Sequence, residues 1–192
     1  MKNEITDRAL IKQYIQGNEA CLEMLINKHQ NKIFTTIILI VNDQYIAEDL
    51  FQETFIKIIR TFKNGKYNEE GKFLPWAVRI ARNLAIDYFR KKKRMPTITS
   101  NDGEDIFRTF QVAQENREEE MIRDQREKTL REIINMLPDE QKEVLVLRHY
   151  GDMSFKEIAE LTNVSINTAL GRMRYALNNM RKIIAEKSII LQ

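Results

Sequence analysis

The spacing of apolar residues is the feature that most limits what this chain can fold into. Apolar side chains recur every three or four positions through nearly all of its 192 residues, which is the period of an α-helix. Six glycines and three prolines leave few turns, and no stretch of useful length alternates apolar and polar residues as a strand does. The sequence therefore predicts an all-α protein, with helices at approximately 4–16, 18–41, 43–62, 71–94, 117–136, 139–150, 154–162 and 165–186.

The composition changes between the fourth and fifth predicted helices. Segment 95–116 has a proline near its start and then concentrates Ser, Thr, Asn, Asp and Gly, which is typical of a linker. We therefore expect two small helical domains, 1–94 and 117–192, joined by this linker. It also holds a short apolar patch, which favours either a local collapsed turn or docking onto another surface: Ile106, Phe107, Phe110 and Val112.

Charge is distributed unevenly, although the formal net charge is only +3. Acids without compensating bases occupy 43–53, whereas seven Lys or Arg residues and one acid lie between Arg79 and Arg94. No acid occurs between Leu161 and Ala185, a stretch that holds four bases: Arg172, Arg174, Arg181 and Lys182. One acidic and two basic surfaces are expected, and clustered cations suit contact with phosphate.

Several classes of protein are disfavoured by what the sequence lacks. The single cysteine, Cys21, cannot form an internal disulfide, and the N-terminus lacks the layout of a signal peptide, so a cytoplasmic location is expected. The most apolar run, 33–41, is shorter than the roughly 20 residues of a membrane helix, so no membrane insertion is expected. Because His29 and His149 lack neighbours at ligand spacing and no nucleophile–base pattern occurs, we expect no metal, cofactor or catalytic residue.

The predicted helix at 71–94 brings aromatic, amide and basic side chains together. Trp76 and Asn83 suit stacking against and hydrogen bonding to unstacked bases, while the basic end of the helix suits phosphate. The sequence therefore favours binding of nucleic acid whose bases are accessible. Two alternatives remain open, in which Trp76 is a core residue and Asn83 is an ordinary exposed polar residue.

A second informative unit spans 152–181. Ser154 followed by Glu157 forms a capping box that begins a short helix, and Asn163 suits the left-handed turn that ends it. Ser165 then caps a longer helix. A helix, a tight turn and a helix with a polar start and basic flank are the plan of a helix-turn-helix that enters a major groove. The alternative is an ordinary core hairpin, which gives no reason for bases to gather without acids.

Three segments together carry a family resemblance: AEDLFQETFIKII (47–59), WAVRIARNLAIDYFRKKKR (76–94) and LPDEQKEVLVLRHYGDMSFKEIAELTNVSINTALGRMRYALNNMRK (137–182). Their order and spacing resemble a bacterial RNA polymerase sigma factor of the extracytoplasmic-function (ECF) group of the sigma-70 family. The resemblance implies a sigma-2-like helical bundle over 1–94 and a sigma-4-like helix-turn-helix domain over 117–192. It also implies a subunit that directs core polymerase to promoters and aids DNA melting, and that is not an enzyme.

The resemblance further implies partners and surfaces for them. The partners are bacterial core RNA polymerase, through its β′ coiled coil and its β flap, promoter DNA, and an anti-sigma factor. Residues three to four positions apart share one face of a helix, so the acids of the helix at 43–62 form one acidic face. Taken alone, such a face is expected to be solvated surface. The family likeness implies that three residues of this face contact the β′ coiled coil: Asp49, Gln52 and Glu53.

The same likeness divides the DNA contacts between the two domains. The likeness implies that the first domain binds the downstream promoter element, including its flipped bases, through Trp76, Arg79, Arg82, Asn83 and Asp87. It implies that the same domain contacts the DNA backbone through Arg90, Lys91 and Lys92. In the second, the upstream element is contacted as duplex by Ser165, Asn167, Thr168, Leu170, Gly171, Arg172 and Arg174.

This chain departs from the pattern of its relatives in both domains. Where housekeeping members carry two adjacent tryptophans, Ala77 follows Trp76, which predicts a weaker melting wedge. TALGR stands where many relatives read TVKSR, so Leu170 suits a thymine methyl and cannot bind phosphate.

Two other classes of function compete with this interpretation. A free-standing helix-turn-helix regulator would bind duplex DNA as a homodimer, with the N-terminal half as a dimerisation or ligand module. In that case the acidic face and the Trp76–Asn83 face would be incidental. A DNA recombinase would need a nucleophile within a basic cluster, which these residues do not assemble.

Overall fold

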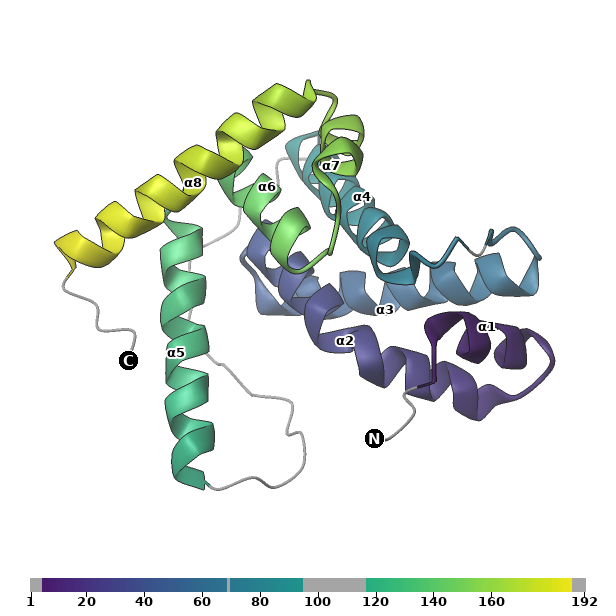
Figure 1. Cartoon of the computed structure of the whole chain (residues 1–192). Helices are drawn as coiled ribbons and strands as arrows, with labels where there is room; N and C mark the ends of the chain where they lie inside the picture. The colour runs from purple at the N-terminus through teal and green to yellow at the C-terminus, as the bar shows by residue number, and fades with distance from the viewer. Residues whose placement is uncertain (1–4, 69, 95–116, 188–192) are drawn as a thin grey trace.

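The computed structural model describes residues 5–68, 70–94 and 117–187. Within these ranges the chain forms eight α-helices and no strand, in agreement with the predicted fold class and close to the predicted boundaries (Figure 1). They are α1 (Asp7–Ile15), α2 (Glu19–Val41), α3 (Gln44–Lys63), α4 (Phe73–Arg94), α5 (Arg117–Asn135), α6 (Asp139–His149), α7 (Phe155–Thr162) and α8 (Ile166–Glu186). The predicted linker and its apolar patch lie outside the described residues.

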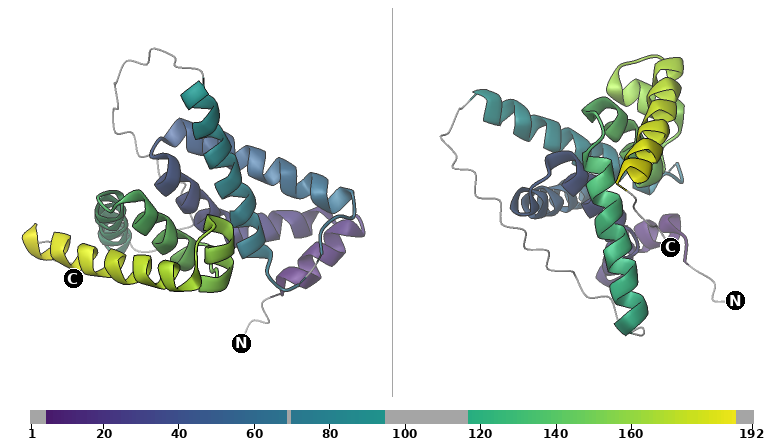
Figure 2. Two further views of the ribbon diagram at one scale, coloured as in Figure 1. Left: turned by 90° about the horizontal axis from the view of Figure 1, so that it is seen from above. Right: turned by 90° about the vertical axis from the view of Figure 1, so that its left-hand side faces the viewer.

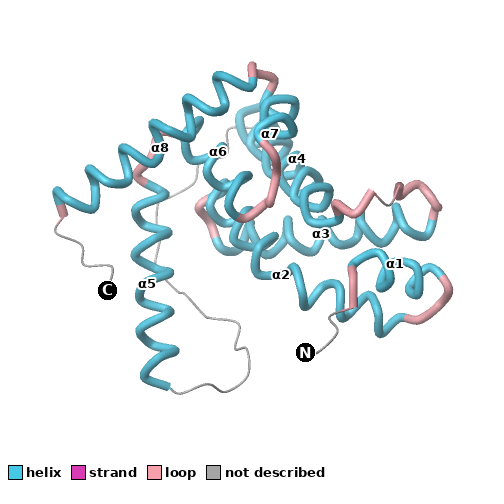
Figure 3. Tube along the Cα trace, in the orientation of Figure 1, coloured by secondary structure: helices cyan, strands magenta, loops and turns pink. Residues whose placement is uncertain are grey.

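The first four helices form a bundle around α2, which packs against α1, α3 and α4. The turn between α2 and α3 is short because Asn42 takes the left-handed conformation, with φ of 52°, and ends α2. Asp43 then caps α3, since its Oδ1 accepts from the Ile46 backbone N–H at 3.1 Å. Figure 3 shows this connection and the other short loops that join neighbouring helices.

The last three helices confirm the predicted helix-turn-helix geometry. Ser154 and Glu157 form a complete capping box at the start of α7, and Asn163 ends that helix with φ of 56°. Ser165 caps α8, and its side chain accepts from the Thr168 N–H at 3.0 Å. Pro138 lies at the N-cap of α6.

The two helical groups, α1–α4 and α5–α8, pack directly against each other. One continuous core joins Val78 and Ala81 of α4 to Leu147 of α6 and Ile158 of α7, and all four are fully buried. A second cluster packs Leu39 of α2 with apolar residues of the C-terminal group: Ile134, Leu137, Leu145, Val146 and Ala176. In Figure 1, α6 and α7 accordingly lie against α4 and the end of α2.

Candidate functional site

The exposed stripe of α4 is the first candidate surface. Arg79, Asn83, Asp87 and Arg90 are all exposed, because they follow one another at three or four positions on the side opposite the buried alanines. Arg82, Asn83, Asp87 and Arg90 line one hollow on this helix. A side chain that offers both a donor and an acceptor, Asn83, therefore stands between cations.

The basic end of α4 carries exposed cations that are weakly held. Arg90 approaches Asp87 at 3.5 Å with both side chains largely exposed, and Lys92 Nζ lies 6.0 Å from the centre of the Tyr88 ring. Exposed pairs of this kind contribute about 0–1 kcal/mol, so these cations can turn toward phosphate at little cost. Both views of Figure 2 show this end of α4, which includes Lys91, projecting from the rest of the molecule.

Trp76 lies in an aromatic cluster at the opposite end of α4. Its ring centre is 4.5 Å from that of Tyr67, 5.9 Å from Phe62 and 6.1 Å from Phe73. The side chain is half-buried against the core of the N-terminal group. Trp76 therefore anchors the loop after α3 to α4, and Ala77 beside it is fully buried.

Arg82, one of the α4 residues expected to contact DNA, is bound within the protein by a carboxylate. Its Nε and Nη2 donate to Oε1 of Glu143 in α6, at 2.9 and 2.7 Å. Only 16% of the Arg82 side chain and 23% of the Glu143 side chain are exposed. Hydrogen bonds to charged groups in such surroundings are worth about 1.5–3 kcal/mol, so Arg82 is held by the C-terminal group rather than presented to solvent.

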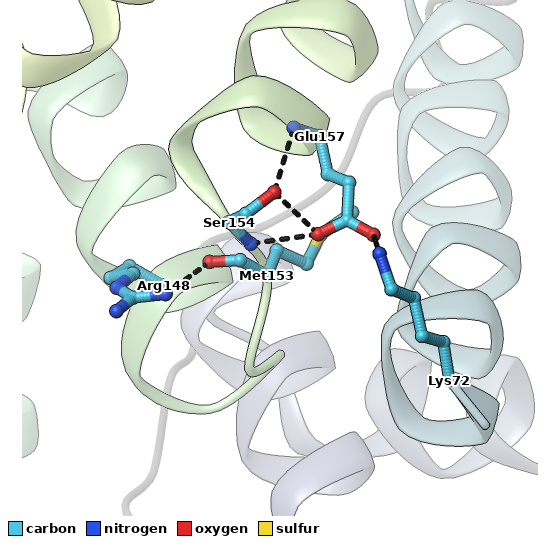
Figure 4. Close-up of polar contacts among 5 residues, drawn as sticks. All are labelled: Lys72, Arg148, Met153, Ser154 and Glu157. Carbon is cyan, nitrogen blue, oxygen red and sulfur yellow. Dashed lines mark hydrogen bonds and ion pairs between the residues drawn. The ribbon is translucent and has the colours of Figure 1, made fainter.

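A second ion pair crosses between the groups beside α7 (Figure 4). Lys72 Nζ lies 2.8 Å from Oε1 of Glu157, whose Oε2 accepts from the N–H and the hydroxyl of Ser154 at 2.8 and 2.6 Å. Partial burial acts to raise the pKa of Glu157, but the bonds from Lys72 and Ser154 prevail and lower it to about 2. Nearby, Arg148 donates to the Met153 carbonyl at 2.8 Å and holds the loop before α7.

The acidic face of α3 is the third candidate surface. Asp49, Gln52 and Glu53 are exposed, as the spacing predicts, while the opposite face of the helix buries Leu50, Thr54 and Ile58. Glu53 lies 3.6 Å from Lys57 one turn later. This leaves carboxylates and an amide on one exposed face, which suits a basic or hydrogen-bonding partner.

The start of α8 presents the fourth surface. Five of the residues expected to contact duplex DNA are exposed, and Gly171 and Arg172 are half-buried; the exposed ones are Ser165, Asn167, Thr168, Leu170 and Arg174. Arg172 Nη2 pairs with Glu140 of α6 at 2.9 Å. A Cβ built at Gly171 meets nothing within 4 Å, so packing within the described residues does not require glycine there.

Sequence reasoning missed the residues that act across long sequence separations. Lys72 and Glu157 are 85 positions apart, and Arg82 and Glu143 are 61 apart, so no local pattern reveals either pair. His29 is a further case: the structure buries it, with Nε2 2.9 Å from Asp7 Oδ2, 22 positions away. Burial lowers the pKa of His29, and Asp7 opposes that shift.

Two kinds of site are absent from the part of the chain that the structure describes. No group of three or more His, Cys, Asp or Glu side chains there is arranged to hold a metal ion. None of the described helices is both long and apolar enough to cross a membrane.

Comparison with known proteins matches both helical groups to one family. Residues 25–95 match the model of Sigma-70 region 2, and residues 127–177 match that of Sigma-70, region 4. The chain is 29% identical over 177 residues to RNA polymerase sigma-H factor of Pseudomonas aeruginosa, covering 90% of this chain and 91% of that protein. It is 26% identical over 183 residues to ECF RNA polymerase sigma factor SigW of Bacillus subtilis, covering 93% and 97%.

Solved structures share the fold over most of the chain. CnrH in complex with the cytosolic domain of CnrY aligns with a TM-score of 0.61 at 18% identity, over 94% of this chain and 97% of that one. The sigma factor RpoE in complex with the anti-sigma factor NepR, from Bartonella quintana, aligns with a TM-score of 0.64 at 17% identity, over 85% and 96%. Both matched regions, their order and these relatives agree that the chain belongs to the sigma-70 family, as a sigma factor of the ECF group.

Proposed function

We propose that this protein is the promoter-specificity subunit of a bacterial RNA polymerase, which directs the core enzyme to particular promoters and aids DNA melting. The observation that carries the proposal is that the two matched regions, 25–95 and 127–177, contain α4 and the first half of α8, the helices that carry the exposed residues assigned here to DNA. We assign residues 1–94 to the domain that binds core polymerase and the downstream element, 95–116 to a linker, and 117–192 to the domain that binds the upstream element.

The exposed stripe of α4 suits the strand-opening step. Unstacking a base costs a few kcal/mol, roughly, and a protein recovers it by stacking and hydrogen bonding to bases that only the open form exposes. Asn83 is exposed and offers both kinds of hydrogen bond, and the neighbouring cations suit phosphate. Trp76, half-buried in its aromatic cluster, is assigned to the boundary between paired and unpaired bases.

The start of α8 suits the upstream element as duplex. A helix N-terminus with small polar side chains fits the major groove, and Asn167 and Thr168 there are exposed. Arg174 is exposed beside them and suits phosphate or guanine. Leu170, also exposed, suits a thymine methyl, so this position contributes base contact rather than charge.

The acidic face of α3 is assigned to the polymerase. Asp49, Gln52 and Glu53 would dock on the coiled coil of the β′ subunit, and the C-terminal domain would contact the β flap. The solved relatives are complexes with an anti-sigma factor or with a cytosolic domain of a second protein, which supports an anti-sigma partner for this chain as well. A subunit of this kind works in the cytoplasm and changes no covalent bond.

Reconstitution tests the proposal. Purified chain is mixed with bacterial core polymerase, and transcripts are mapped on genomic fragments in the absence of any other sigma factor. We expect transcripts that start at specific positions and disappear when Asp49 and Glu53 are both replaced by lysine. Binding of palindromic duplex as a homodimer, without any binding to core polymerase, would instead support a free-standing regulator.

A further inference from the structure

We propose that Gly171 determines part of the promoter specificity of this protein, because it leaves a gap on the exposed face of α8 that accepts the methyl group of a thymine in the upstream element. The inference rests on the proposed function of α8, and it concerns which base that helix prefers. The gap is bordered by two side chains, Asn167 one turn before Gly171 and Tyr175 one turn after it.

Gly171 lies at the centre of the exposed face of α8. Because an α-helix turns by about 100° per residue, Gly171 is on the side opposite the buried Ala169 and Ala176. Asn167 is exposed, and Tyr175 is 63% exposed. In Figure 1 and in the left view of Figure 2, α8 runs along the outside of the molecule. A ligand that approaches this face therefore meets Gly171 at its centre.

The fold gives no reason for a glycine at this position. A Cβ there would meet nothing within 4 Å, so no neighbour in the described residues needs the space. The backbone of Gly171 is helical, unlike that of Gly17, Gly65 and Gly71, whose φ is positive. Glycine also weakens a helix interior, so its presence costs stability. Since neither packing nor backbone geometry requires glycine, its presence indicates that a ligand approaches the backbone closely here.

The absent side chain leaves a gap in a row of side chains. Residues four positions apart form ridges along a helix, and Asn167, Gly171 and Tyr175 make one such row. No side-chain atom of Asn167 or Tyr175 lies within 4 Å of the place where a Cβ of residue 171 would be, so neither closes the gap. At about 1.5 Å per residue, the Cα atoms of these two residues are about 12 Å apart. One small group therefore has room to reach the backbone between them.

The shape and chemistry of the major groove indicate which group enters the gap. The groove is about 12 Å wide and an α-helix with its side chains is about 10–12 Å across, so a helix fits with little clearance. A glycine on the face turned toward the bases lets the backbone come closer to their edges. Thymine projects an apolar methyl group into this groove, and cytosine does not. Leu170, 45% exposed beside Gly171, adds apolar surface, so the gap favours thymine.

Replacement of thymine by uracil tests the proposal on the DNA side, because uracil lacks only the methyl group. The full chain is assembled with bacterial core polymerase, and its binding to the promoter fragments found by reconstitution is measured at one salt concentration. Each thymine of the upstream element is replaced in turn by deoxyuracil. At one position we expect about fourfold weaker binding, the loss that follows removal of one buried methyl-sized group. The same replacement between the two promoter elements is the control and should leave binding unchanged.

Gly171→Ala tests the proposal on the protein side, because the added methyl group fills the gap. We expect this variant to bind the thymine fragment at least about tenfold more weakly than the parent. The uracil fragment relieves the clash, so the variant should bind uracil more tightly than thymine and reverse the preference of the parent. Leu177→Ala, a change in an exposed side chain farther along α8, is the control and should keep that preference. Equal responses to uracil by Gly171→Ala and the parent, or equal binding of the thymine fragment, would overturn the proposal.

The outcomes separate the role of Gly171 from the proposed function. If the reconstituted polymerase gives no specific transcripts, the proposed function fails. The comparison of thymine with uracil is then made on duplexes that the full chain alone selects from random DNA, and it still decides whether Gly171 accepts a methyl group. A chain that binds duplex in neither form overturns both ideas. If transcription is specific and no uracil in the upstream element weakens binding, the function stands and the role of Gly171 is wrong.

Discussion

Replacing Glu157 by glutamine separates two roles that meet in one side chain. Its Oε2 completes the capping box of α7, and its Oε1 pairs with Lys72 across the interface between the groups. Glutamine still provides an oxygen for the N–H of Ser154, because capping boxes accept Glu or Gln at this position. Glu157→Gln should therefore remove the charge and the ion pair while it keeps most of the cap.

The magnitude follows from exposure and from the pKa. A shift of the Glu157 pKa from 4.5 to about 2 would be worth several kcal/mol if it were unscreened. The Lys72 side chain is 57% exposed, so solvent screening reduces the contribution to about 1 kcal/mol. Because the folded-state pKa is lowered, this stability is fully present above pH 4.5 and is lost as the pH falls toward about 2.

The assay is urea unfolding of the full chain, followed by circular dichroism, between pH 7 and the acid limit of folding. Glu157→Gln should cost about 1 kcal/mol at pH 7, and its free energy of unfolding should fall less steeply on acidification below pH 4.5 than that of the parent. Glu160→Gln, an exposed change on the same helix, is the control. A Glu157→Gln protein as stable as the parent at pH 7, with the same acid dependence, would refute the reasoning.

Three further predictions concern α4 and α8. Asn83→Ala should impair open-complex formation more than closed-complex binding, measured by permanganate footprinting and by gel shift; equal losses in both assays would contradict the assignment of Asn83 to unpaired bases. Gly171→Ala should raise the free energy of unfolding by about 0.5–1 kcal/mol, because glycine weakens a helix interior and a Cβ there would meet no neighbour. The measurement is the denaturant midpoint, and an unchanged midpoint would contradict this prediction. Ala77→Trp, which restores the tryptophan pair of housekeeping members, should destabilise the protein by about 1–3 kcal/mol or more because Ala77 is 0% exposed. A melting temperature equal to that of the parent would show that the pair fits this fold.

The burial of Ala77 changes the meaning of the missing tryptophan. From the sequence, Trp76 followed by Ala77 predicts a weaker wedge for melting. In the structure, the position after Trp76 faces the core, so a second large ring there would have to displace buried neighbours. Whether Trp76 contacts promoter DNA stays a prediction, and its place in the aromatic cluster shows a structural role as well.

Local patterns determined the helices because their causes are local. The capping box at Ser154, the left-handed Asn163 and the cap at Ser165 each depend on residues within four positions, and all three were predicted and confirmed. The exposed faces of α3 and α8 also follow from spacing along one helix. These are the parts of a fold that a sequence specifies by itself, since the interacting groups are adjacent in the chain.

Tertiary structure alone decided which charges are available. Arg79 and Arg82 look alike in the sequence, yet one is exposed and the other is bound to Glu143, 61 positions away. The composition of 95–116 predicted two helical groups, but nothing in the sequence indicated that α6 and α7 would share a core with α4. Such contacts depend on the shape and charge of two assembled surfaces, which exist only once both groups have folded.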